Sequence, residues 1–127
     1  MKIDHVGLYV RNLERAKNFF ESYFQAQANQ LYHNPKTGFS SYFLAFKDET
    51  RLEIMTRDAQ LEDQGEGYLV GYHHLAISLE SQEAVDKLTQ QLQADGYRVV
   101  SGPRVTGDGY YESLIEILDG ILIEITV

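Results

Sequence analysis

The sequence contains no cysteine. A disulfide framework and a thiolate metal site are therefore excluded, and any metal ion would have to be bound by His, Asp, Glu or backbone oxygen. Basic residues are few: 11 Lys and Arg stand against 19 Asp and Glu, a formal net charge of −8, with no dense basic cluster. Such a chain repels phosphate backbones and anionic lipids. We expect neither nucleic acid nor a membrane as a partner.

Long apolar runs are missing as well. None approaches the length of a transmembrane span, and the N-terminus leads directly into a patterned strand instead of a signal-peptide core. A cytoplasmic protein is the default expectation. With 127 residues, 43% hydrophobic and 24% charged, the chain is long enough to bury a core and ordinary for one soluble globular domain. We expect a single domain over residues 1–127.

One stretch occurs twice. Residues 2–10 (KIDHVGLYV) are echoed by residues 72–79 (YHHLAISL), each with a histidine followed by an apolar, a tiny and another apolar residue. Successive side chains of a strand point to opposite faces. Apolar residues therefore occupy one face of each strand, and the other carries His5, Gly7 and Tyr9 or, in the second copy, His74, Ala76 and Ser78.

A second echo closes each copy. The segment 52–56 (LEIMT) is repeated as 123–126 (IEIT), with the acid opposite the isoleucines. The separations agree, 48 residues from His5 to Glu53 and 50 from His74 to Glu124. Internal repeats indicate related structural units. We predict two modules, residues 1–57 and 71–127, joined by an acidic, glycine-containing linker over 58–70.

The first module reads as β-α-β-β-β. Asn12 is a helix cap, and the apolar spacing that follows predicts a helix packed on the apolar face of the first strand. A connection over 25–30, a short strand at 30–33 and strands at 39–46 and 51–56 complete it. The apolar face of the helix comprises Ala16, Phe19, Phe20, Tyr23 and Phe24.

The second module repeats this order. After the strand at 72–79, Ser81 caps a helix that turns Val85, Leu88 and Leu92 inward and stops at Asp95-Gly96. A strand at 97–101 ends at Gly102-Pro103, a loop covers 106–109, and a hairpin of strands 110–118 and 120–127 turns at Asp119-Gly120. The predicted fold class is α+β, two tandem β-α-β-β-β modules with curved mixed sheets.

The helix-free faces carry the candidate site. If the two sheets curve towards one another, these faces line a ligand cleft in which His5, Glu53, His74 and Glu124 converge. Two imidazoles and two carboxylates form a non-thiolate ligand set for one divalent metal, Zn, Ni, Co, Mn or Fe, with positions left open. Gly7 and Ala76, beside the histidines, would leave room for a ligand.

Each of these residues alone has a plainer explanation. A lone strand histidine is usually structural or exposed, and a glutamate on a solvent face is commoner still. The four residues occupy corresponding places of the repeat, and in both copies their side chains point to the face opposite the apolar residues. This agreement favours the metal site. His33, before Asn34-Pro35, is expected to be exposed in a turn, and His73, of opposite parity to His74, to be structural. A glycine-rich loop precedes Tyr110 and Glu112 and could direct the side chain of either residue towards a ligand.

At these residues the chain resembles the vicinal oxygen chelate superfamily, which contains glyoxalases, bleomycin-resistance proteins and extradiol dioxygenases. The similarity covers essentially the whole chain, and small glyoxalase-like members are the most similar. It rests on residues 4–10, 52–57, 74–78, 102–113 and 119–125. It implies paired modules, a divalent metal on His5, Glu53, His74 and Glu124, and frequently a homodimer, in some members with a cleft completed across the dimer.

A metal with open positions can polarise a carbonyl, and the anion formed by proton loss from the adjacent carbon is then a chelated enediolate. Glu53 or Glu124 could carry that proton as general base and then acid. We therefore predict a glyoxalase-like lyase or isomerase acting on a small α-oxo or α-hydroxy carbonyl compound. Two carboxylates favour this over oxygen activation, which typically uses two histidines and one carboxylate. Candidate substrate-binding residues are Tyr9, Arg51, Tyr110 and Glu112.

Other activities of the superfamily remain open. Glutathione-dependent members carry an arginine in the first strand and an asparagine shortly before the first glutamate, where this chain has Leu8-Tyr9-Val10 and Glu49-Thr50-Arg51-Leu52. The substrate can be another thiol adduct or a free metabolite, and epimerases and thiol transferases use similar ligands. A metal-free binding protein of the bleomycin-resistance type is the alternative from another class, which nine tyrosines and the acidic balance would suit.

Overall fold

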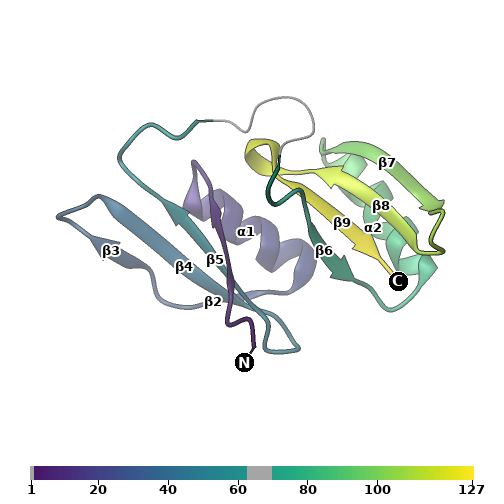
Figure 1. The fold of residues 1–127 in the computed structure, drawn as a ribbon, viewed down its shortest axis with the longest axis horizontal. Coiled ribbons are helices and arrows are strands. Elements are labelled where there is room, and N and C mark those ends of the chain that lie inside the picture. Colours follow the sequence, from purple (N-terminus) through teal and green to yellow (C-terminus); the bar gives the residue numbers. More distant parts are fainter. Residues whose placement is uncertain (1, 63–69) are drawn as a thin grey trace. The chain divides into compact units, whose positions relative to one another are not determined.

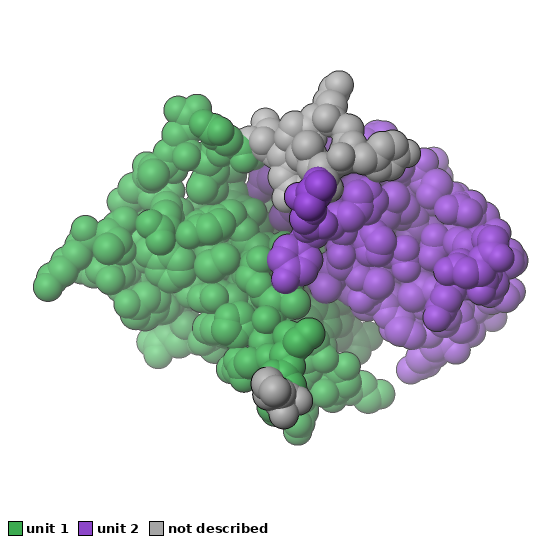
Figure 2. Space-filling model, viewed as in Figure 1, with its two compact units in different colours: residues 1–62 green, residues 63–127 purple. Residues whose placement is uncertain are grey.

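The computed structural model describes residues 2–62 and 70–127 (Figure 1). The chain forms two compact units, residues 1–62 and 63–127 (Figure 2). Most of the predicted linker, 63–69, lies outside the described residues. The single-domain description and the module bounds stay predictions.

The first unit is a mixed sheet with one helix. Its strands lie in the order β1-β5-β4-β2, and β3 also pairs with β4. β1 and β5 are parallel, whereas β4 runs antiparallel to β5, β2 and β3. The elements are β1 (Val6–Tyr9), α1 (Leu13–Phe24), β2 (Gln27–Ala28), β3 (Tyr32–Asn34), β4 (Phe39–Ala45) and β5 (Arg51–Thr56).

Helix α1 begins and covers the sheet as its sequence predicts. The Asn12 side chain accepts a hydrogen bond from Arg15 N at 2.9 Å, which satisfies one of the free N–H groups of the first turn. One face of α1 is buried against β4 and β5. The core of this unit includes Val10, Leu13, Ala16, Phe19, Phe20, Ala26, Tyr42, Leu44, Leu52 and Ile54.

The second unit repeats the plan with four strands in the order β6-β9-β8-β7. β6 and β9 are parallel, and the remaining pairs are antiparallel. Its elements are β6 (Leu75–Ser78), α2 (Gln82–Ala94), β7 (Arg98–Val105), β8 (Tyr111–Glu116), a short 3-10 turn (Leu118–Gly120) and β9 (Leu122–Thr126).

Helix α2 and the last hairpin also follow the sequence signals. The Ser81 hydroxyl accepts a hydrogen bond from Ala84 N at 3.2 Å, and Gly96 ends the helix at φ 94°. Asp119 and Gly120 both have positive φ, 56° and 75°, as a tight hairpin turn of this type requires. The helix buries Val85, Thr89 and Leu92, so Thr89 takes the inward place predicted for Leu88, which is half-buried.

Three local predictions were wrong. The segment 25–30 contains the short strand β2, and β3 follows separately, so the second strand of the first module is divided in two. The strand at 97–101 does not end at Gly102-Pro103, because β7 continues to Val105 through shifts of register. β7 is an edge strand, where a residue without an N–H is tolerated. His33 lies in β3 and not in a turn, although it is exposed.

The α+β architecture of tandem modules is confirmed (Figure 1). In each unit a parallel pair, the first strand of the unit beside its last, forms one edge of the sheet. Among the described residues no helix is both long and apolar enough to cross a membrane.

Candidate functional site

Each unit brings one of the predicted histidines to its predicted glutamate. In the first unit His5 Nε2 lies 3.6 Å from Glu53 Oε2, and in the second His74 Nε2 lies 3.4 Å from Glu124 Oε2. The side chains of both glutamates are largely buried, 17% and 18% exposed, whereas both histidines remain partly open at 37% and 35%. The two pairs are therefore close copies of one another.

The register of the parallel strands explains this proximity. Gly7 is the Cα partner of Glu53, and Ala76 is the partner of Glu124. Each histidine precedes that small residue by two positions and so points to the same face as the glutamate. Both histidines lie just before the first paired residue of their strand, so the strands are shorter than predicted. The alternation of side chains between the two faces is nevertheless as predicted.

The expected room beside Gly7 is partly taken. A Cβ at Gly7 would lie 2.9 Å from Met55 Cε, so the methionine side chain covers this glycine. The prediction that Gly7 leaves space for a ligand is wrong in this respect. The atom over the glycine is the end of the flexible Met55 side chain.

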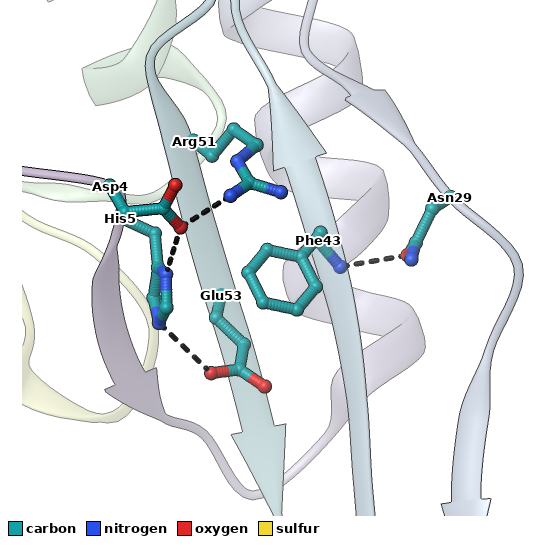
Figure 3. A network of polar contacts seen from close by, with 6 residues as sticks. All are labelled: Asp4, His5, Asn29, Phe43, Arg51 and Glu53. Carbon is teal, nitrogen blue, oxygen red and sulfur yellow. Dashed lines mark hydrogen bonds and ion pairs between the residues drawn. The ribbon is translucent and has the colours of Figure 1, made fainter.

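The ring of His5 is held from its other side. Its Nδ1 lies 2.8 Å from Asp4 Oδ2, and Asp4 also forms an ion pair with Arg51 (Figure 3). The hydrogen bond to His5 and the nearby Arg51 charge hold the pKa of Asp4 below its ordinary value. An ionised carboxylate can only accept, so His5 donates from Nδ1 to Asp4, and its Nε2 faces Glu53.

The second unit holds His74 differently. His73 occupies the place of Asp4, and the two imidazole Nδ1 atoms lie 2.9 Å apart. Asp4 and His73 were not predicted as site residues. The repeat contained a signal for them, because each immediately precedes the histidine of its copy.

Glu112 lies beside the second pair. It is on the strand next to Glu124, its side chain is 13% exposed, and Arg104 Nη2 is 3.7 Å from its Oε1. Burial, followed by the charge of Glu124 and a hydrogen bond with it, raises the pKa of Glu112. The hydroxyl of Thr126, the Cα partner of Glu112, is buried and has no hydrogen-bond partner among the described residues. This face thus holds two neighbouring carboxyl groups and an unsatisfied polar atom.

The other candidate substrate-binding residues are more scattered. The Tyr9 hydroxyl accepts a hydrogen bond from Arg57 Nε at 2.9 Å. Arg51 is engaged by Asp4 and lies over the Phe43 ring at 5.1 Å. Tyr110 is 54% exposed and precedes β8, with its backbone bonded to Thr106. Their roles towards a substrate stay predictions.

The donor chemistry fits a divalent metal. Both N···O separations exceed the usual hydrogen-bond range of about 2.7–3.2 Å. They are close to the roughly 3.4 Å that separates neighbouring donors around a tetrahedral ion with bonds of about 2.1 Å. Among the described residues no group of three or more His, Asp or Glu side chains arranged to hold a metal is found. Each pair offers two ligands, and the convergence of all four residues stays a prediction.

Comparison with known proteins identifies the family. The model of the Glyoxalase/Bleomycin resistance protein/Dioxygenase superfamily matches residues 2–125. The chain belongs to this superfamily. A relative with the name uncharacterized protein YqjT, from Bacillus subtilis strain 168, is 33% identical over 125 residues, which span 95% of this chain and 94% of the relative.

Two solved structures share the fold. A possible glyoxalase from Bacillus cereus is 24% identical with a TM-score of 0.72, and covers 100% of this chain and 99% of its own. The fosfomycin resistance protein FosX from Listeria monocytogenes, in a complex with Mn(II) and sulfate, is 19% identical with a TM-score of 0.73, over 99% of this chain and 91% of its own. The similarity at these identities concerns the fold.

Proposed function

We propose that this superfamily member is a metal-dependent lyase or isomerase of the glyoxalase type. Its substrate would be a small α-oxo or α-hydroxy carbonyl compound, thiol adducts included. The observation that carries the proposal is the repeated His–Glu pair: His5 with Glu53 and His74 with Glu124, at 3.6 and 3.4 Å, each on the helix-free face of a parallel strand pair.

All four side chains would hold a single divalent ion, Zn, Ni, Co, Mn or Fe. Two neutral imidazoles and two carboxylates balance the charge of such an ion without thiolates. When bound, the ion would supply Lewis acidity towards the carbonyl oxygen of the substrate. The Mn(II) complex of FosX supports a divalent ion in a protein of this fold.

The chain itself would move the proton. Glu53 and Glu124 each have one carboxylate oxygen turned towards a histidine and are only partly exposed. One of them would accept the proton from the carbon beside the carbonyl and return it to the neighbouring carbon. Tyr9, Arg51, Tyr110 and Glu112 would contact the substrate. We further propose a cytoplasmic homodimer.

Metal content tests the proposal. The protein is purified without chelator, and its bound metal is measured beside two double variants, His5→Ala with Glu53→Gln and His74→Ala with Glu124→Gln. About one ion per four-ligand site is expected in the unchanged protein, and both variants should lose it. A matched control, His33→Ala with Glu116→Gln, removes the same residue types from positions bonded to Ser40 and Arg98 and should keep the metal.

The pattern of loss separates the alternatives. If each variant loses half of the metal, the two pairs bind separate ions and a shared site is wrong. A substoichiometric signal that is equal in all proteins would favour a metal-free ligand-binding protein of the bleomycin-resistance type. If metal is bound, a panel of α-oxoaldehyde thiol adducts and acyl-CoA epimers, assayed with Ni²⁺, Zn²⁺ and Mn²⁺ in turn, separates a lyase or isomerase from an epimerase, and turnover of neither substrate class would leave a thiol transferase or a dioxygenase as the candidates.

A further inference from the structure

The two ring nitrogens of His5 face different carboxylates. Nδ1 is within hydrogen-bond distance of Asp4, at 2.8 Å, whereas Nε2 is 3.6 Å from Glu53, too far for a normal hydrogen bond (Figure 3). A neutral imidazole has one N–H and one lone pair. The short contact with Asp4 therefore assigns the proton to Nδ1 and the lone pair to Nε2.

We propose that Asp4 is a positioning residue that fixes the tautomer and ring orientation of His5, so that Nε2 is free to bind a metal ion beside Glu53. This inference rests on the proposed function, since the ion is the reason for the orientation. A carboxylate on the remote nitrogen of a metal-binding histidine raises its basicity and fixes its ring. Asp4 itself would not touch the ion or the substrate.

Asp4 is in turn held in place. Arg51, two residues before Glu53 on β5, forms the ion pair with Asp4, and its guanidinium lies over the ring of Phe43. The same Phe43 ring meets the His5 ring at 5.1 Å and nearly at right angles, 86°. Phe43 is opposite Glu53 in the sheet, and its N–H donates to Asn29 Oδ1 at 2.8 Å (Figure 3). Asp4, His5, Arg51 and Phe43 thus support one another.

The second unit has no carboxylate at this position. His73 accompanies His74, and for His74 Nε2 to be free its Nδ1 must donate to the Nδ1 of His73. A neutral imidazole is a weaker acceptor than a carboxylate, because charge-assisted hydrogen bonds are the stronger ones. His5 should therefore be fixed more firmly than His74.

The tautomer can be measured without any metal. In chelator-treated, ¹⁵N-labelled protein at about pH 8, where an ordinary histidine is neutral, long-range ¹H–¹⁵N correlation spectra should show His5 protonated at Nδ1. Asp4→Ala should transfer population to the form protonated at Nε2. Asp4→Asn, whose amide oxygen can still accept, should keep part of the original form. An unchanged spectrum in Asp4→Ala overturns the inference.

The control removes an equal charge elsewhere in the same unit. Asp48 is in the turn before β5 and bonds to Thr50 instead of His5. Asp48→Ala should leave the His5 tautomer unchanged. Arg51→Gln, which removes the ion pair with Asp4 and the contact with Phe43 but keeps the Asp4 carboxylate, should give a smaller change than Asp4→Ala.

Zinc affinity completes the test, measured by competition with a chromophoric chelator. Asp4→Ala should weaken Zn²⁺ binding by about 10- to 100-fold, Asp4→Asn less, and Asp48→Ala not at all. If Asp4→Ala changes the tautomer but binds Zn²⁺ as tightly as the unchanged protein, the positioning role is wrong and the proposed function survives. If the unchanged protein binds no Zn²⁺, Ni²⁺ or Mn²⁺, the proposed function fails and the inference fails with it.

Discussion

Three glycines near β7 and the loop that follows it differ in what a side chain would meet. At Gly102 φ is 95° and a Cβ would lie 2.5 Å from the backbone oxygen of Glu112. At Gly109 φ is 96° but the space is open, and at Gly107 neither constraint applies. Gly102→Ala should therefore combine backbone strain with a clash against backbone, a loss of about 2–4 kcal/mol in the free energy of unfolding.

The other two glycines are the controls for this prediction. Gly109→Ala should cost only the strain, about 1–2 kcal/mol, and Gly107→Ala should be close to neutral. Urea unfolding of the three variants gives the comparison. Equal losses at Gly102 and Gly109 would contradict a close approach of β7 to β8 at this point.

A second residue-scale prediction concerns Tyr42, which is buried on β4 and donates its hydroxyl proton to Glu14 of α1. This hydrogen bond, followed by burial, raises the pKa of Tyr42, and it is also the first cause that lowers the pKa of Glu14. The raised pKa of Tyr42 adds to the free energy of unfolding. This stabilisation is complete below the ordinary tyrosine pKa and is lost as pH rises through the raised value. The lowered pKa of Glu14 also adds to the free energy of unfolding. That stabilisation is complete above the ordinary glutamate pKa and is lost as pH falls through the lowered value.

Tyr42→Phe removes this hydrogen bond, which is the first cause of both pKa shifts, while Lys17 still lowers the pKa of Glu14. The stability gap between the unchanged protein and this variant should be widest near neutral pH and should narrow towards strong acid and above about pH 10. Urea unfolding at three pH values measures it. Tyr32→Phe, at a side chain 54% exposed, is the control, and a gap that does not depend on pH would refute the link between α1 and β4.

At the scale of elements, α2 is joined to β8 by a buried polar contact. Thr89 Oγ1 lies 2.8 Å from Ser113 Oγ, and it also donates to Val85 O, at 2.7 Å. Both residues are almost fully buried. Thr89→Val leaves the Ser113 hydroxyl buried without a partner, which should cost about 1–3 kcal/mol. Ser113→Ala should cost less, because the Thr89 hydroxyl keeps its hydrogen bond to Val85 O.

The double variant, Thr89→Val with Ser113→Ala, should cost less than the two single losses together, since no polar group is then left unpaired. A coupling of about 1 kcal/mol, obtained from urea unfolding of the four proteins, would be typical of residues in contact. Strictly additive losses would mean that the two hydroxyls do not depend on each other.

Elements with strong local signals could be predicted from the sequence. The caps Asn12 and Ser81 and the turn at Asp119-Gly120 decide backbone geometry within a few residues, and all three are confirmed. The errors concern pairing between strands. β2 is two residues long and exists only because β4 lies beside it, and β7 passes Pro103 only because its edge needs no hydrogen bond there.

At the scale of the molecule, the repeat predicted the composition of each pair but not its surroundings. Parity and spacing were sufficient to place His5 near Glu53 and His74 near Glu124, because a parallel register aligns whole strands. The contacts of Asp4 with His5 and of His73 with His74 depend on side-chain rotation immediately before the strand, which the hydrophobic pattern does not encode. The contact of Met55 with Gly7 also depends on side-chain rotation, so the sequence pattern did not predict it.

The proposed sharing of one ion by two units has a consequence for the whole molecule. A ligand that binds only the folded protein, at 100 times its Kd, stabilises it by about 2.7 kcal/mol. If His5, Glu53, His74 and Glu124 share the ion, Zn²⁺ should slow amide hydrogen exchange in β5 and β9 together. The His5→Ala, Glu53→Gln variant should then lose the zinc-dependent protection of β9, although this variant still has both His74 and Glu124. Protection of β9 that persists in this variant would show that His74 and Glu124 bind the metal without the first pair, and the shared ion would be wrong.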